Sequence, residues 1–178
     1  LKEQQSDVLC DLIAASDLSK ILGWNCTVMS NYCNDSIYCD YLDCDSDQQI
    51  SSINLVTVGI NGTLPSSLGN LLSLTSLDLS YNSLYGSIPT SLGSITELQY
   101  IALNDNLLTG FIPSSFGELS STIRLEISKN SLSGTIPTSL VNLTALTYLD
   151  CSFDQLNSLN ISANTALTYL QCSYNHFN

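Results

Sequence analysis

The sequence predicts an α/β repeat solenoid, in which short strands of successive repeats stack and a small helical, disulfide-stapled cap covers the N-terminal end. This prediction rests on three observations. Apolar residues return at a constant interval, in one register, through the middle of the chain. Five of the 7 cysteines lie between Cys10 and Cys44. Only 11% of the residues are charged and the net charge is -12, so uncharged polar residues have to supply most of the surface.

Residues 1–49 are expected to form the cap. A first helix is expected to begin with Ser6 as its N-cap, and a second, short helix with Ser16–Asp17. Apolar residues at helical spacing follow each start: Val8, Leu9, Leu12 and Ile13, and then Leu18, Ile21 and Leu22. Clustered cysteines are typical of a disulfide framework in an oxidising compartment. A zinc site is disfavoured, because no two cysteines form a C-x2-C pair and the one histidine is His176.

Residues 50–145 contain four repeats of equal length. The pattern is clearest at Leu74, Leu77, Leu79, Asn82, Leu84, Gly86, Ile88, Pro89, Leu92 and Gly93. Two leucines two residues apart lie on the same side of a short strand and point into the core. The asparagine three residues later can satisfy backbone groups of a turn, and the Ile-Pro step favours a second extended segment. One unit cannot bury its apolar face alone, so neighbouring units have to stack.

Residues 146–178 are expected to form one short repeat and an incomplete terminal repeat. Their pattern returns after a shorter interval, from Leu149 to Leu170, and lacks the Gly-x-Ile-Pro step. Asp154 stands where the repeat has asparagine, as Val58 does in the first repeat. Cys151 and Cys172 occupy inward strand positions, where we expect two buried thiols in place of leucine.

The repeats resemble the leucine-rich repeats. Their Gly-x-Ile-Pro element, at residues 86–89, 110–113 and 134–137, is similar to the plant-type subclass of plant receptor ectodomains and polygalacturonase-inhibiting proteins, whereas the shorter terminal units look more like bacterial or protist repeats. The resemblance implies a horseshoe with its parallel sheet on the concave face, and an extracellular or cell-surface protein. It also implies a cap in which Cys33 and Cys39 are joined by a disulfide.

Side chains that alternate with the buried ones are expected to line the concave face. Aromatic and charged groups gather there, which suits a protein, peptide or sugar ligand. The candidate ligand-binding residues are Tyr81, Tyr100, Tyr148, Tyr169, Tyr174, Asp78, Asp105 and Arg124. The same register also places on this face Ala102, Asn104, Glu126, Lys129, Asp150 and Phe153. In the alternative interpretation, which stays open, aromatic side chains on adjacent strands pair to stabilise the sheet.

Five N-x-S/T sequons fit a secreted glycoprotein, although composition alone would give about as many. They lie at Asn25, Asn34, Asn61, Asn142 and Asn160. None falls on a predicted concave strand, so glycans would leave that face open. The acidic run Asp40, Asp43, Asp45 and Asp47 lacks the glycine and glutamate of an EF-hand loop. We therefore expect a solvated acidic turn there and no metal site.

Composition and motifs exclude several classes of function. The chain has 4 Lys and Arg in all, so nucleic acid and anionic membrane surfaces are poor partners. No stretch approaches the roughly 20 apolar residues of a membrane-inserted helix. No nucleophile–base spacing and no phosphate-binding loop is present. We therefore expect a protein that is not an enzyme and needs no cofactor.

We expect an extracellular recognition or adhesion module that binds a protein, peptide or glycan ligand on its concave face. A chain that begins with Leu1 rather than Met is expected to be a processed or excised piece. The alternative is a structural glycoprotein subunit that stacks head to tail into an extracellular filament. The motivation is that the array stops at Asn178 inside a repeat, where an uncapped end would favour self-association.

Overall fold

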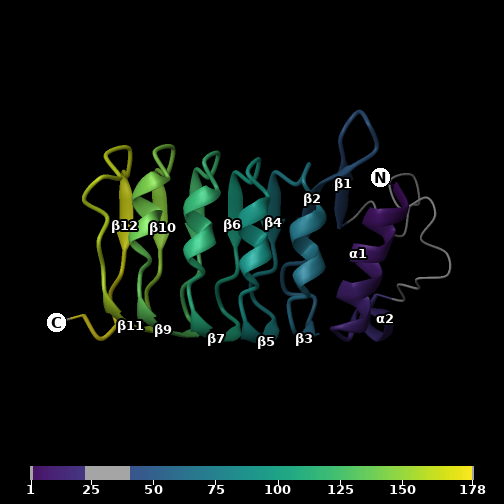
Figure 1. Ribbon diagram of the computed structural model, residues 1–178. Coiled ribbons are helices and arrows are strands. Elements are labelled where there is room, and N and C mark those ends of the chain that lie inside the picture. The colour runs from purple at the N-terminus through teal and green to yellow at the C-terminus, as the bar shows by residue number, and fades with distance from the viewer. Residues whose placement is uncertain (1, 23–40, 178) are drawn as a thin grey trace.

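The computed structural model describes residues 2–22 and 41–177. These residues form an elongated solenoid, with two helices at the N-terminal end and the last repeats at the other (Figure 1). Each repeat contributes a strand to a sheet along one side, and most contribute a second, short strand to a sheet along the opposite side. The predicted stack of repeats around a parallel sheet is confirmed.

The described elements fall into four groups. The helices of the cap are α1 (Lys2–Ala14) and α2 (Leu18–Ile21). The larger sheet contains, in spatial order, β1 (Leu42–Cys44), β2 (Ile50–Asn54), β4 (Ser76–Asp78), β6 (Tyr100–Ala102), β8 (Arg124–Glu126), β10 (Tyr148–Asp150) and β12 (Tyr169–Gln171). The second sheet contains β11 (Gln155–Ser158), β9 (Ser131–Thr135), β7 (Leu107–Phe111), β5 (Ser83–Ser87) and β3 (Asn61–Gly62). The 3₁₀ helices are η2 (Ser66–Asn70), η3 (Thr90–Ser94), η4 (Ser114–Glu118) and η5 (Thr138–Asn142).

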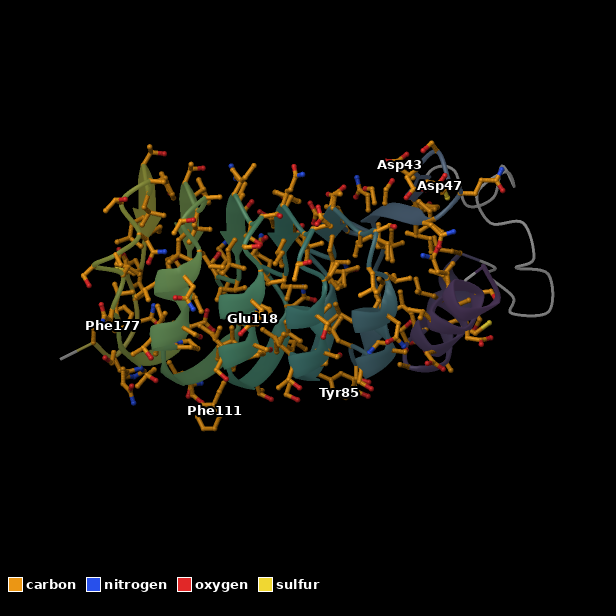
Figure 2. All side chains as sticks on the ribbon, turned by 45° about the horizontal axis from the view of Figure 1, so that its top comes forward. Asp43, Asp47, Tyr85, Phe111, Glu118 and Phe177 are labelled. Atoms are coloured by element: carbon orange, nitrogen blue, oxygen red, sulfur yellow. The ribbon has the colours of Figure 1, made fainter. Side chains whose placement is uncertain are left out.

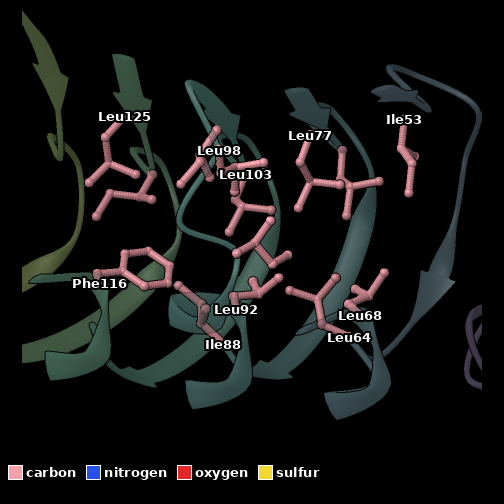
Figure 3. Packing of buried hydrophobic residues seen from close by; sticks show 14 of the residues in the cluster. Ile53, Leu64, Leu68, Leu77, Ile88, Leu92, Leu98, Leu103, Phe116 and Leu125 are labelled. Carbon is pink, nitrogen blue, oxygen red and sulfur yellow. The ribbon is translucent and has the colours of Figure 1, made fainter. Parts of the chain in front are cut away.

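Leucine and isoleucine side chains of successive repeats, together with Phe116, fill the interior (Figure 3). Leu77 of β4 lies opposite Ile101 of β6, and Ile101 lies opposite Leu125 of β8. All three side chains are fully buried. Because successive side chains of a strand point to opposite faces, their neighbours in sequence point outward. Burying one such side chain contributes about 1.5–3 kcal/mol, so each repeat is stabilised by the repeat that covers it.

The first helix begins earlier than the sequence predicts. Helix α1 begins at Lys2, so Ser6 lies inside it and the prediction that Ser6 is its N-cap is wrong. The Oε1 atom of Gln5 accepts the backbone N–H of Ile50 at 2.9 Å in a buried position, which ties the first turns of α1 to the start of β2. Helix α2 forms where it was predicted. The apolar positions of α1 are buried as expected: Val8, Leu9, Leu12 and Ile13.

An antiparallel hairpin of β1 and β2 joins the cap to the array. Its turn contains Asp45 and Asp47 of the acidic run, and Oδ1 of Asp45 closes it by accepting the N–H groups of Asp47 and Gln49, each at 2.9 Å. Strand β1 was not predicted, because its three residues are too short a run to reveal a strand pattern. Cys44 of β1 is part of a disulfide bond.

Four predicted features of the cap lie outside the described residues. They are the Cys33–Cys39 disulfide, the sequons at Asn25 and Asn34, and Asp40. The division into residues 1–49, 50–145 and 146–178 remains our proposal. It is supported by the strand partners of the larger sheet, which are evenly spaced in sequence from β4 to β10 and lie closer in sequence between β10 and β12.

The second extended segment of each repeat lies earlier than the sequence predicts. Strand β5 ends at Ser87, directly before Ile88 and Pro89, and helix η3 follows the proline. Proline cannot donate a hydrogen bond to a neighbouring strand, so the pairing stops in front of it. The step to proline therefore separates the strand of the second sheet from the 3₁₀ helix in each of the four longer repeats.

The two predicted buried thiols differ in exposure. Cys151 is fully buried, and burial raises the pKa of its thiol to about 12. Cys172 is half-buried and packs against the edge of the core. The prediction of a buried thiol is therefore confirmed at Cys151 and only partly at Cys172.

A row of asparagines links each repeat to the one before it. Oδ1 of Asn106 accepts the N–H of Leu84 at 2.9 Å. Its Nδ2 donates to the carbonyl groups of Leu79, Leu103 and Asn104 at 3.0, 3.2 and 3.3 Å. The same pattern recurs at Asn82, Asn130 and Asn175. One side chain thus makes hydrogen bonds with four backbone groups of the turns, and of these the Asn104 carbonyl also accepts the N–H of Tyr81.

Asp154 occupies the same position and completes half of this pattern. Its Oδ1 accepts the N–H of Leu132 at 2.7 Å. Its Oδ2 is buried and has no hydrogen-bond partner among the described residues, because a carboxylate oxygen has no proton to donate where asparagine has an amide. Burial raises the pKa of the Asp154 carboxyl to about 7. A bound proton would restore one donor to the ladder.

We predict that Asp154→Asn stabilises the protein at neutral pH by about 1–3 kcal/mol, because the amide satisfies the carbonyl groups that the carboxylate cannot. The folded-state pKa of about 7 lies above the ordinary value of 3.8. The stability of the natural protein should therefore fall as pH rises through this window and level off above pH 7. Urea denaturation at several pH values checks this. Asn106→Asp should have the opposite effect, and equal stability of the natural protein and Asp154→Asn at every pH would contradict the prediction.

Glycines in the 3₁₀ helices allow adjacent repeats to approach closely. A Cβ atom on Gly93 of η3 would lie 2.3 Å from the carbonyl oxygen of Ser115 in η4. Gly117 of η4 meets Ser139 of η5 in the same way. In η5 the equivalent residue is Val141, and no 3₁₀ helix follows it within the described residues. A side chain is tolerated at this position only where no further 3₁₀ helix packs against it.

We predict that Gly93→Ala lowers the free energy of unfolding by about 1–3 kcal/mol, because the added methyl group pushes η3 and η4 apart. Chemical denaturation measures the change. Ser94→Ala, at an exposed position in the same helix, is the control and should change stability by less than about 0.5 kcal/mol. Equal stability of the two variants would contradict this account of the packing.

Candidate ligand-binding face

The outer surface of the larger sheet is the candidate ligand-binding face, and we call it the concave face. Parallel pairing places equivalent residues of successive repeats side by side in rows. The first row consists of Ser76, Tyr100, Arg124, Tyr148 and Tyr169. The second row consists of Asp78, Ala102, Glu126, Asp150 and Gln171. The third row consists of the residues that follow each strand, at Tyr81, Asp105, Lys129, Phe153 and Tyr174.

Three side chains of the first row form one stack. The Arg124 guanidinium lies 3.7 Å from the centre of the Tyr148 ring, within cation–π distance. The rings of Tyr148 and Tyr169 are 4.1 Å apart and nearly parallel. Burial, then a hydrogen bond with Tyr169, raises the pKa of Tyr148 to about 12. A hydrogen bond with Glu126 raises the pKa of Arg124. The aromatic pairing that the sequence left open is therefore present in this row.

Tyr100 is bound within the protein by two carboxylates. Its hydroxyl lies 3.1 Å from Oδ2 of Asp78 and 3.3 Å from Oε1 of Glu126. Burial, and then these two carboxylates, raise its pKa. Asp78 also accepts the N–H and the hydroxyl of Ser80. Every polar atom of the Tyr100 and Asp78 side chains thus has an intramolecular partner.

The third row stands out because its backbone is left-handed. Its residues have φ between 53° and 58°, which is uncommon for residues other than glycine. Lys129 is 3.1 Å from Oδ1 of Asp105, and their hydrogen bond raises the lysine pKa. The rings of Phe153 and Tyr174 stack at 4.2 Å. Tyr174 remains 71% exposed and Phe153 45% exposed, so this pair offers accessible aromatic surface.

Two carboxylates of the second row retain open oxygens. Asp150 lies opposite Glu126 in register. Its Oδ1 accepts the N–H of Ser152 at 3.0 Å and the hydroxyl of Ser152 at 2.7 Å. Oε1 of Glu126 is bound to Arg124 and Tyr100. No hydrogen bond from a described residue reaches the other oxygen of either carboxylate, so both can accept hydrogen bonds from a ligand.

All eight candidate residues lie on this face, but the predicted register errs in exposure at several other positions. Ala102 and Asn104 are buried, and so are Ser80, Ser128 and Ser152, the equivalents of Asn104 in other repeats. Ala102 is small enough to be covered by its larger neighbours, and Asn104 is 3.2 Å from Asp105 at the turn. Glu126, Asp150 and Phe153 were not among the chosen candidates, although the register placed them on the face. The signal that could have identified them was their position in the repeat, which is equivalent to that of the chosen candidates.

The three described sequons leave this face uncovered. Asn61 begins β3, Asn142 ends η5, and Asn160 follows β11. All three residues are exposed. Whether they carry glycans stays a prediction.

A second surface also displays aromatic side chains. Tyr85 and Phe111 project from the second sheet, opposite the concave face (Figure 2). They are 49% and 70% exposed. A shallow groove beside Phe111 is lined by Ile88, Pro113 and Pro137. The groove has no charged side chain among its lining residues, so it offers no charge for a ligand to recognise.

Leucine-rich-repeat models match two adjacent segments of the chain, residues 73–95 and residues 96–156. The chain is a leucine-rich-repeat protein. The match confirms the leucine-rich repeats that the sequence was expected to contain. A search of curated proteins found no match.

Several solved structures of plant leucine-rich-repeat ectodomains are similar to this leucine-rich-repeat protein. The GASSHO1/SCHENGEN3 ectodomain from Arabidopsis thaliana, in complex with CASPARIAN STRIP INTEGRITY FACTOR 2, matches 87% of the chain at 32% identity with a TM-score of 0.80. The Arabidopsis HAESA ectodomain, in complex with an extended IDA peptide hormone, matches 99% at 30% identity with a TM-score of 0.81. A chain of the Arabidopsis BIR3–SERK2 complex matches 94% at 29% identity with a TM-score of 0.79.

The leucine-rich-repeat protein spans different shares of these relatives. It covers 19% of the GASSHO1/SCHENGEN3 chain and 30% of the HAESA chain, but 91% of the chain from the BIR3–SERK2 complex. In the described part of the chain, neither helix is long and apolar enough to cross a membrane.

We predict that two tyrosines of the face respond differently to loss of the hydroxyl group. Tyr100→Phe should lower the free energy of unfolding by about 1–2 kcal/mol, because it removes the donor between two partly buried carboxylates. Tyr174→Phe, the matched control at an exposed position, should change it by less than about 0.5 kcal/mol. Chemical denaturation measures both changes. If both variants lose the same free energy of unfolding, the hydroxyl of Tyr100 is no more important to the fold than that of Tyr174, and this account of the two tyrosines is wrong.

Proposed function

We propose that this leucine-rich-repeat protein is a non-enzymatic recognition module of an extracellular or cell-surface protein, and that it binds an extended peptide segment along the concave face. The observation that carries the proposal is the exposed Phe153–Tyr174 pair, which lies close to two carboxylates with open oxygens. Stacked aromatic rings offer a rigid contact surface that costs little conformational entropy on binding.

The position of the binding surface within the array follows from which residues are already engaged. Tyr100 and Asp78 are bound to each other and to neighbouring residues. Tyr169 and Tyr174 belong to the strand and turn of the last described repeat and are 44% and 71% exposed. We therefore place the ligand over β8, β10 and β12 rather than over β2 and β4.

The comparisons support a peptide as the ligand. The GASSHO1/SCHENGEN3 and HAESA ectodomains were solved with CASPARIAN STRIP INTEGRITY FACTOR 2 and with a peptide hormone, respectively. Each row of the concave face supplies one outward side chain per repeat, which suits a peptide that lies across the strands. Head-to-tail stacking into a filament stays a prediction, and no observation on the described residues favours it over ligand recognition.

We predict that a displayed library of random peptides about 12 residues long, extending over about 40 Å, yields binders that require the concave face. Phe153→Ser with Tyr174→Ser should weaken these binders at least about tenfold, because it removes the exposed anchor pair. Fluorescence polarisation with the selected peptides measures affinity.

The matched control is Tyr85→Ser with Phe111→Ser, which removes two aromatic side chains of similar exposure from the second sheet. Binding to this control should stay within about twofold of the natural protein. If the library yields no binders, or if both double variants lose binding equally, the concave face is not the recognition site.

A further inference from the structure

Near β10 and β12, the first and third rows of the concave face carry aromatic side chains, and the second row between them carries carboxylates at Glu126 and Asp150. Glu126 and Asp150 lie opposite each other on β8 and β10. On one side of them lies the Tyr148–Tyr169 stack, and on the other the Phe153–Tyr174 stack. We call these six residues the aromatic–carboxylate patch.

The cations of the face are already engaged, which leaves the patch with unbalanced negative charge. Arg124 is bound to Glu126 and covers one face of Tyr148. Lys129 is bound to Asp105. Asp150 has no ion-pair partner among the described residues, and its polar contacts are with Ser152. The chain as a whole has a net charge of -12, so its charge outside the patch is also net negative.

We propose, building on the proposed function, that the aromatic–carboxylate patch selects ligands by a cationic side chain, arginine or lysine, which binds Asp150 and Glu126 between the two aromatic stacks. A cation on two carboxylates makes charge-assisted hydrogen bonds, which are about twice as strong as neutral ones. The aromatic rows on both sides shield these bonds from water and contact the aliphatic stem of the side chain. An anionic ligand would instead meet like charge at every step of its approach.

The stack of the first row shows that this surface holds a guanidinium group well. Arg124 lies against Tyr148 and binds a carboxylate at the same time. A ligand arginine on Asp150 would have the same two kinds of neighbour, one strand further along. Asp150 is the more open of the two carboxylates, because Glu126 already binds Arg124 and is close to Tyr100.

The experiment uses the peptides selected on the natural protein. We expect arginine and lysine to be enriched in them over aspartate and glutamate. Replacing the enriched arginine by citrulline, which keeps the shape and removes the charge, should weaken binding at least about tenfold. Asp150→Asn should do the same, because it removes the charge but keeps Oδ1 as an acceptor for Ser152. Its thermal midpoint should match that of the natural protein.

The matched control is Glu118→Gln, which removes one negative charge from an exposed position on η4, away from the concave face (Figure 2). It should leave binding within about twofold of the natural protein, because a charge beyond the Debye length is screened. If a folded Asp150→Asn variant and the citrulline peptide bind as tightly as the originals, cation selection is wrong. If binding still requires Phe153 and Tyr174 in that case, the proposed function stands without it.

Discussion

The asparagine ladder is the interaction on which the rest of the structure depends. Each ladder side chain accepts one N–H from the preceding repeat and donates to carbonyl groups of that repeat and of its own. Repeats joined in this way have to stack in a fixed register, because a shift of one residue would leave buried backbone groups without partners. The residue before the ladder position adopts a left-handed backbone at Tyr81, Asp105, Lys129, Phe153 and Tyr174. The hydrogen bonds of the ladder therefore also determine where the residues of the third row lie on the concave face.

The sequence predicted this framework because the framework depends on buried positions that recur. Leu77 and Leu79 are two residues apart and both fully buried, as a strand of period two requires. Their recurrence fixed the register, and the register placed Tyr148 beside Tyr169 before any contact was known. Even the departure at Asp154 was visible as a substitution in the ladder. What the sequence did not show was its consequence, a carboxyl group with one oxygen buried and without a hydrogen bond among the described residues.

Other features could not be predicted, because they depend on contacts between residues that share no pattern. Strand β1 exists through its pairing with β2, and α1 extends to Lys2 with Gln5 anchored on Ile50. On the concave face, the alternation of side chains along a strand predicts which residues point outward, but not which neighbours they contact. It could not distinguish Tyr100, held between two carboxylates, from Tyr174, which is mostly exposed.

Because of this difference between the tyrosines, the two ends of the concave face differ in how much of their polar and aromatic surface is open to a ligand. Toward β4 and β6, outward polar groups satisfy one another, so a ligand would have to break internal bonds to use them. Toward β10 and β12, the aromatic stacks keep accessible surface and Asp150 keeps an open oxygen. Binding there orders few additional side chains, because Tyr148, Tyr169, Phe153 and Tyr174 are already held in stacks. Under the proposed function, stability and recognition would therefore fall mainly to different repeats of one array, and the side chains that distinguish these repeats on the concave face stand at outward positions, where the ladder imposes no choice of residue.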